Sequence, residues 1–400
     1  MSNLWNMIVR WLAATLLIGW SLVATGQLSG HFYLEKSRFA PGEPIFLYFE
    51  VVNEGPQSEN IHSADPYSFC SGYQIKISSD PQATSSCPLL GVAGSCLSSS
   101  IVLPSGKSRI ERLLLNFDHS ISAPGPYSVQ AERYLPHAHA TTNYFSPDTP
   151  KDTLEVRTTM YFEVDPSLSE NPESLHAFVA ALRSSDLNRR NEAARTLASI
   201  APKSLEDTLL GFADSNEFRQ FAPLAFHRLN TQPSMKALAD LLEKTEAGSY
   251  EHMKSADYLA ESGDPQWFPL LHDVAQKHAQ ILNYVSDAAE LGGDKMLPTL
   301  ILLMGSPDKE FTRVNAVTAI GYTGSRSAVP ILLDLLKNSD VGIADRALYG
   351  LRLLTHRSAN DDESESPQSQ YHRWSQWWAR EGASAPIYKA TECGNFNPLR

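Results

Sequence analysis

Two histidines separated by one residue, His137 and His139, could do chemistry together. An H-x-H pair in an extended segment places both imidazoles on one side, where they can begin a metal site. Asp148 and Asp152 follow in the same loop, but no spacing fixes a third ligand. We therefore predict no metal here, and the loop remains a candidate for an enzyme site only.

Motifs of the large enzyme families are absent from the sequence, among them G-x-S-x-G, H-E-x-x-H, the Walker A loop and G-x-G-x-x-G. The S-G-K-S run at Ser105–Ser108 is not a phosphate loop, because Ile101 stands where such a loop requires glycine. We assign no catalytic residue and expect no cofactor. A triad built from distant Ser, His and Asp residues remains an alternative, because geometry rather than spacing defines it.

The four cysteines, Cys70, Cys87, Cys96 and Cys393, are candidates for structural disulfides if the chain is exported. Each of the three full pairings joins Cys393 to the N-terminal half. One local Cys87–Cys96 bridge with two free thiols is the alternative. Zinc fits poorly, since no C-x-x-C pair or nearby histidine doublet completes a tetrahedral set.

The N-terminus has the three-part form of a secretory signal peptide over residues 1–26. Arg10 is its one charged residue, an apolar run spans Trp11 to Ala24, and small residues precede Gln27. The run is short for a membrane-spanning helix. We predict a secreted or periplasmic protein with no membrane span after signal removal. An uncleaved anchor is the alternative.

Composition and charge limit the class of protein. Apolar residues make up 42% and charged residues 20% of the 400 residues, as in a soluble chain of two or three domains. Lys and Arg total 33 against 45 Asp and Glu, a formal charge of −12. This balance argues against a nucleic-acid partner.

Residues 30–165 predict a β-sandwich. Ile45, Leu47, Phe49 and Val51 alternate with the residues between them, and further short runs of this kind are separated by turn sequences such as "LPSGKS" and "SAPGPY". About seven such strands are typical of an immunoglobulin-like fold. The "PGEPI" opening and the "PGPYSVQAER" run resemble bacterial immunoglobulin-like domains.

Residues 170–356 predict an array of about six helix pairs. Gly263, Gly293 and Gly324 recur at intervals of 30 and 31 residues. The spacing D-x4-R-x2-A occurs at Asp214 and again at Asp308. Here the chain resembles HEAT-like repeats of the short kind, which implies an α-solenoid. The predicted fold class is therefore a multidomain all-β plus all-α protein.

The C-terminal part predicts an acidic linker over residues 357–370 and a Trp-rich helix and tail over residues 371–400. Trp374, Trp377 and Trp378 fall on one face of the helix. We interpret them as a cap on the last repeat, since solenoid ends need covering. An aromatic platform for sugar or peptide is the alternative.

These features together indicate an exported bacterial interaction protein that is not an enzyme. A solenoid of this resemblance implies a protein or peptide partner on its concave face, for which His227, Tyr258, Tyr284 and Tyr349 are candidates. Some HEAT-like proteins are chromophore lyases, but the resemblance transfers no catalytic residue. Two alternatives are an envelope enzyme, with its site at the domain junction or in the His137/His139 loop, and a protease inhibitor acting through the sandwich.

Overall fold

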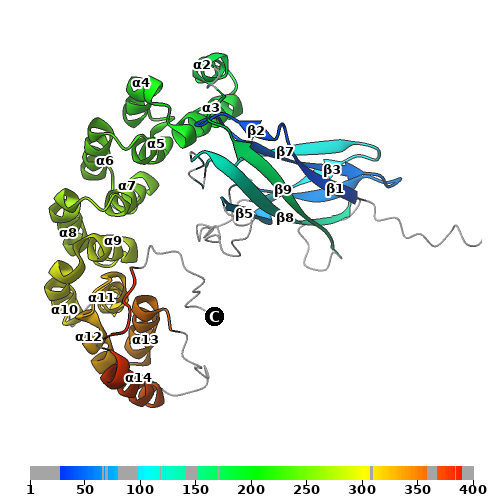
Figure 1. The fold of residues 1–400 in the computed structure, drawn as a ribbon. Coiled ribbons are helices and arrows are strands. Elements are labelled where there is room, and N and C mark those ends of the chain that lie inside the picture. The colour runs from blue at the N-terminus through cyan, green and yellow to red at the C-terminus, as the bar shows by residue number, and fades with distance from the viewer. Residues whose placement is uncertain are drawn as a thin grey trace, which may run out of the picture.

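A β-rich N-terminal region is followed by an arc of helices in the computed structural model (Figure 1). The structure describes residues 28–64, 67, 71–79, 98–117, 119, 121, 123–140, 151–168, 172–306, 310–357, 367–382 and 384–389. The predicted signal peptide and all four cysteines lie outside these residues, so both predictions remain untested.

Two sheets form the β-rich region. The smaller has the order β1-β3-β7, formed by Leu28–Leu34, Phe46–Asn53 and Ser108–Leu114. The larger has the order β2-β9-β8-β4-β6, formed by Arg38–Phe39, Asp152–Val164, Gly125–His139, Glu59–Ala64 and Ser98–Leu103. Strand β5, Tyr73–Ser78, also pairs with β8. Strand pairing is antiparallel except between β2 and β9.

The sheets face each other across one apolar core. In β3, Leu47, Phe49 and Val51 are buried while Glu50 is half-buried, as alternation of side chains across a sheet requires. The Phe49 ring meets the edge of the Tyr73 ring of the other sheet, with 6.0 Å between centroids. The period of two in the sequence therefore marks the face that each strand buries.

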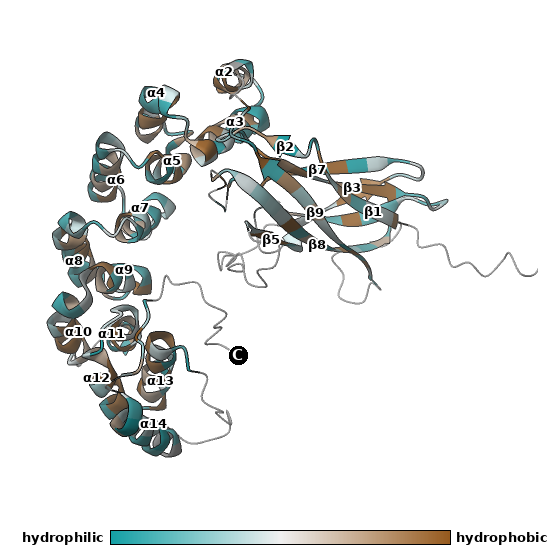
Figure 2. Ribbon diagram, viewed as in Figure 1, coloured by the Kyte–Doolittle hydropathy of each residue, from teal (hydrophilic) through white to brown (hydrophobic). Residues whose placement is uncertain are grey.

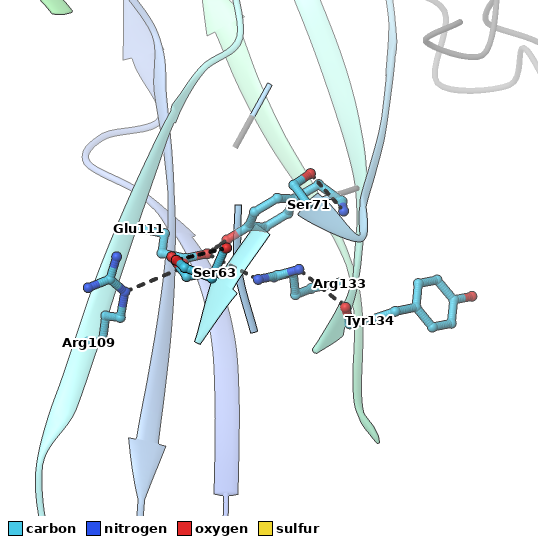
Figure 3. Close-up of polar contacts among 8 residues, drawn as sticks. Ser63, Ser71, Arg109, Glu111, Arg133 and Tyr134 are labelled. Atoms are coloured by element: carbon cyan, nitrogen blue, oxygen red, sulfur yellow. Dashed lines mark hydrogen bonds and ion pairs between the residues drawn. The ribbon is translucent and has the colours of Figure 1, made fainter. Parts of the chain in front are cut away.

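A buried ion pair joins the two sheets inside this core (Figure 3). Arg133 of β8 lies 3.4 Å from Glu111 of β7, and Tyr73 donates a hydrogen bond to the same carboxylate. The Arg133 guanidinium also lies 4.3 Å from the centroid of the Tyr73 ring. Loss of one partner would leave a buried charge uncompensated, so this group fixes how the sheets face each other.

Six helix pairs make up the arc. The pairs are α2 and α3 (Pro172–Ala181, Leu187–Ile200), α4 and α5 (Glu206–Leu210, Ala222–Leu229), α6 and α7 (Gln232–Lys244, Tyr250–Glu261), α8 and α9 (Phe268–Lys277, Leu282–Gly292), α10 and α11 (Leu297–Met304, Glu310–Tyr322), and α12 and α13 (Ala328–Leu335, Val341–Thr355). A last helix, α14, spans Pro367–Glu381. From α4 onward, the second helix of each pair lies on the inner side of the arc, which is also the side of the β-rich region (Figure 1).

Helices of the array are amphipathic, with hydrophilic and hydrophobic residues on the same helix (Figure 2). Their apolar residues form one continuous core that runs from α2 to α14. Within the described residues, no helix is both long enough and apolar enough to cross a membrane.

Glycines end three of the inner helices and so produce the period seen in the sequence. Gly263, Gly293 and Gly324 have φ values of 67°, 53° and 60°. Glycine adopts a positive φ without steric penalty, so it is favoured where a helix must end and the chain must turn.

Two Asp residues that do not keep the exact D-x4-R-x2-A spacing cap the second helices of their repeats. Asp186 and Asp340 each accept hydrogen bonds from two N–H groups in the first turn of α3 and α13. At Asp214 the pattern departs from this arrangement, since a short 3-10 turn intervenes and α5 begins only at Ala222. Asp308 lies outside the described residues.

Helix α14 covers the end of the array. Trp374 and Trp377 belong to the apolar core and are 2% and 5% exposed, while Trp378 is half-buried. Beyond the helix the chain returns along the array, where the Tyr388 N–H donates to the Leu354 carbonyl at 2.9 Å.

The β-rich region meets the array at α3. The Arg195 guanidinium lies 4.2 Å from the centroid of the Tyr67 ring and 5.5 Å from that of Phe117. Beside this stack, Arg112 of β7 forms an ion pair with Glu192 of α3. Aromatic and charged contacts therefore define the junction between the two regions.

Candidate active site

His137 and His139 lie at the end of strand β8, and not in a loop as the sequence predicted. Their Nδ1 atoms lie 3.2 and 2.7 Å from the carboxylate of Glu59 on the neighbouring strand β4. The Glu59 side chain is only 2% exposed, so the two imidazoles supply hydrogen-bond partners to a buried carboxylate. Within the described residues, no group of three or more His, Cys, Asp or Glu could hold a metal ion.

The four residues predicted to line a partner-binding face divide into two kinds. His227 of α5 stacks on Tyr258 of α7, with 4.3 Å between ring centroids. The Tyr349 hydroxyl of α13 lies 3.4 Å from that of Tyr322 on α11. Tyr284, in contrast, is fully buried, and its hydroxyl accepts a hydrogen bond from a backbone N–H. It is a packing residue.

Four carboxylates accompany these rings on the inner helices. Asp257 and Glu261 are four residues apart on α7, and Asp287 and Glu290 are three apart on α9, so each pair shares one side of its helix. Charge repulsion among the four contributes to the pKa of Glu261 and of Asp287. We call these four residues the inner acidic cluster.

Sequence reasoning missed the inner acidic cluster, although its spacing carries a signal. Asp287 follows Asp257 by 30 residues and Glu290 follows Glu261 by 29, which is the repeat period. Equivalent positions of stacked repeats lie side by side on the array. Acids that recur at the repeat period on inner helices are therefore expected to converge.

Asp287 is the most buried member of the cluster. Only 7% of the residue is exposed, and its Oδ2 atom has no hydrogen-bond partner among the described residues. Burial raises the pKa of this carboxyl well above its usual value, and repulsion by Asp257 and Glu290 adds to the effect. Burial and the neighbouring acids therefore favour the protonated form of Asp287 relative to an exposed carboxyl.

Glu261 is the accessible acid of the cluster, with 42% of its side chain exposed. Burial of the remainder and repulsion by Asp257 raise the pKa of Glu261 to about 7, against the opposing effect of Lys254. A carboxyl with a pKa near neutrality can both accept and donate a proton under physiological conditions. Glu261 thus has the properties of a general acid–base.

The groups around Glu261 keep defined protonation states. Burial, with a further contribution from Arg228, lowers the pKa of His227 to about 4, so its imidazole is neutral at 3.5 Å from Glu261. Burial raises the pKa of Tyr258, whose phenol therefore remains a donor. Burial lowers the pKa of Lys254, but its 2.6 Å ion pair with Asp257 outweighs this, and the pKa is raised overall.

Arg228 connects the cluster to the β-rich region. Its charge acts on Glu261 and His227, and it also contributes, after burial, to lowering the pKa of His119 to about 4. His119 belongs to the segment that follows β7. The inner acidic cluster consequently lies next to the junction of the two regions.

Comparison with known proteins identifies one repeat of the array. Residues 312–338 match the family of the PBS lyase HEAT-like repeat. No curated protein matches the sequence.

Several solved structures share local similarity with the chain. The complex of CpcE and CpcF of phycocyanin lyase from Nostoc sp. PCC7120 is 15% identical, with 52% of this chain and 82% of that chain covered and a TM-score of 0.27. A β-glucosidase from Erythrobacter marinus is 16% identical over 33% and 15% of the two chains, with a TM-score of 0.17. Salmonella alpha-2-macroglobulin reacted with methylamine is 10% identical over 87% and 27%, with a TM-score of 0.18. Similarity this low supports no inference about activity.

The repeat match corrects the sequence-based prediction of function. We predicted a non-catalytic interaction protein, whereas the matching repeat is named for a lyase, which is an enzyme. The prediction that the chain is not an enzyme is therefore wrong, and the alternative of an enzyme with its site at the domain junction agrees better with the match. The HEAT-like nature of the array is confirmed for this repeat.

Proposed function

We propose that the protein is a lyase-type enzyme whose active site is the inner acidic cluster, with Glu261 as its general acid–base. The observation that carries the proposal is an accessible Glu261 whose pKa is raised to about 7, beside a buried Asp287 whose Oδ2 atom lacks a hydrogen-bond partner among the described residues and whose pKa is also raised. Carboxyl groups whose pKa values are perturbed by burial and by neighbouring charges gather at acid–base sites. The lyase repeat at residues 312–338 supports the class of reaction.

A lyase makes or breaks a bond without hydrolysis or oxidation, so the enzyme's main task is to move a proton. Glu261 would accept that proton in one direction and return it in the other. The Tyr258 phenol is a hydrogen-bond donor beside it, and Lys254 supplies a fixed positive charge through its pair with Asp257. A positioned acid–base of this kind contributes about 10²- to 10⁴-fold to a rate.

Mass balance tests the class of reaction. The full-length protein is incubated with an extract of bacterial envelope, and consumed and formed species are followed by mass spectrometry. A lyase gives products whose masses sum to that of the substrate, or the reverse, with no water added. We expect Glu261→Gln to lower the rate by about 10²-fold or more.

The matched control is Glu243→Gln, the same change at an exposed position on the outer helix α6. It should leave the rate unchanged. Products that carry an added water, or equal rates in wild type and Glu261→Gln, would contradict the proposal.

We propose that the β-rich region is an immunoglobulin-like sandwich. The face-to-face sheets support this, and so does the Tyr127 hydroxyl, which donates to the Ala123 carbonyl at 2.9 Å. A tyrosine that bonds back to backbone a few residues upstream is a hallmark of such domains. Tyr127→Phe should lower the free energy of unfolding by about 1 kcal/mol, measured by urea denaturation.

We propose further that the enzyme works outside the cytoplasm, with a protein or peptide as its substrate. The signal-like segment at residues 1–26 supports export, and the long inner side of the arc supports an extended substrate (Figure 1). N-terminal sequencing of the purified protein should begin at Gln27. A sequence that begins at Met1 would contradict cleavage.

A further inference from the structure

The buried carboxyl of Asp287 points to a ligand that the site lacks. Its Oδ2 atom is without a hydrogen-bond partner in the described residues, although the side chain is more than nine-tenths buried. An unpaired buried carboxyl oxygen costs free energy unless a donor reaches it. The groups on the neighbouring helices therefore decide what kind of donor fits.

The charged groups around the Asp287 Oδ2 atom favour binding of a cation. Lys254 forms its ion pair with Asp257 at 2.6 Å, and its charge opposes the raised pKa of Glu261 and of Asp287 without outweighing burial. Glu261 meets only the neutral imidazole of His227, at 3.5 Å, among the contacts of the described residues.

Aromatic rings border the same acids. The Tyr258 ring lies on the helix of Glu261, stacked against His227. Tyr322 and Tyr349 meet on the two following inner helices, and the acidic groups of α9 act on the Tyr322 phenol. Carboxylates beside aromatic faces are how proteins recognise ammonium and guanidinium groups.

We propose that the inner acidic cluster binds an organic cation, with an ammonium or guanidinium group seated between Asp287 and Glu261 and beside the ring of Tyr258. This inference rests on the proposed function and names its substrate class. The described residues hold no set of His, Cys, Asp or Glu that could bind a metal ion, which favours an organic over an inorganic cation. The N–H groups of the cation supply the donor that Asp287 lacks.

Binding of such a cation is coupled to proton release. Burial, and then Asp257 and Glu290, raise the pKa of Glu261 and of Asp287. Lys254 opposes this at both carboxyls, and Arg228 opposes it at Glu261. A cation favours the ionised carboxylates, so it expels protons as it binds. Below the pKa of Glu261, affinity should therefore rise about tenfold for each pH unit and proton released.

Calorimetry on the full-length protein tests the proposal with n-butylguanidinium, n-butylammonium and neutral n-butanol. Titrations at about pH 6 in buffers of different ionisation enthalpy measure the protons released. We expect the two cations to bind at least about tenfold more tightly than butanol, with roughly one proton released. A lysine-containing peptide and its norleucine analogue distinguish a protein-borne cation from a free amine.

Two variants test which residues bind the cation and release the proton. Asp287→Asn keeps the shape of the neutral acid, so it should fold, and it should weaken cation binding about tenfold or more. Glu261→Gln should lower the number of protons released on binding by about one. The control Glu243→Gln should change neither the affinity nor the proton release. Equal binding of butanol and the cations, or tighter binding of Ca²⁺ than of either cation, would overturn the inference.

The two proposals fail in different ways. If Glu261→Gln abolishes the lyase reaction while no organic cation binds, the proposed function stands and the cation inference falls. If cations bind with proton release but Glu261→Gln leaves every reaction unchanged, the site is a binding site and the proposed function falls.

Discussion

At the scale of single residues, the raised pKa of Glu261 affects the stability of the folded protein as well as the proposed function. Its pKa of about 7 lies above the ordinary value of 4.5, so the folded protein binds this proton more tightly than the unfolded chain does. The stabilising contribution of the protonated acid is fully present below pH 4.5 and is lost as the pH rises through 7. The active acid is therefore a cost to the fold at neutral and basic pH.

Glu261→Gln should accordingly stabilise the protein at basic pH. We expect the free energy of unfolding at about pH 8 to rise by about 1 kcal/mol, a figure reduced for the solvent exposure of the side chain. The difference should shrink toward zero as the pH falls to about 4, where the wild-type acid is protonated in both states. Urea denaturation between about pH 4 and pH 8 measures this difference in the free energy of unfolding. A variant less stable than wild type at pH 8 would contradict a Glu261 pKa raised by burial and by charge repulsion.

Aromatic residues that lie near the proposed site could be selected from the sequence, but the acids were overlooked and their burial could not be shown. His227, Tyr258 and Tyr349 were selected from the predicted second helices, which the structure places on the inner side. Asp287 looks in sequence like any solvated acid on a helix. Only the packing of α9 against α7 and α11 shows that it is buried, and packing between repeats is not written in the local pattern.

At the scale of elements, the helix pairs were predictable because each depends on local signals. Glycines end α7, α9 and α11, and Asp340 begins α13. Local signals are weaker around residues 203–229, where the structure has the short α4, three 3-10 turns and no capping Asp. The extent of β8 was also missed, since His137 and His139 extend a strand that the residue pattern ends earlier.

We propose that α14 caps the array through its tryptophans. Trp377 is 5% exposed, donates a hydrogen bond to Glu381 at 2.9 Å and lies under the Arg357 guanidinium. Trp377→Ala should therefore lower the free energy of unfolding by about 3 kcal/mol or more, measured by chemical denaturation. Gln376→Ala, an exposed position on the same helix, is the control. Unchanged stability in Trp377→Ala would favour an aromatic binding platform instead.

At the scale of the whole molecule, the junction of the two regions sets the surroundings of the active site. Arg195 lies against Tyr67 and Phe117, and Arg228 acts on both His119 and the acidic cluster. Cation–aromatic contacts of this kind contribute about 0.5–2 kcal/mol. The β-rich region therefore contributes to the electrostatic surroundings of the proposed site.

Arg195→Ala should loosen this junction without unfolding either region. We expect calorimetric unfolding to separate into two transitions, with a loss of about 1–2 kcal/mol in the coupling between them. Arg189→Ala, an exposed residue on the same helix, should leave the transitions unchanged. A single transition at the wild-type temperature in Arg195→Ala would show that the junction does not depend on this stack.

The most direct test of the account is a pH titration of the Glu261 carboxyl itself. In protein labelled with ¹³C at glutamate side chains, the resonance that disappears in Glu261→Gln identifies the residue, and its chemical shift reports ionisation. The account predicts a midpoint at about 7, raised by burial and by the neighbouring acids. A midpoint near the ordinary value of 4.5 would remove the basis for Glu261 as the general acid–base.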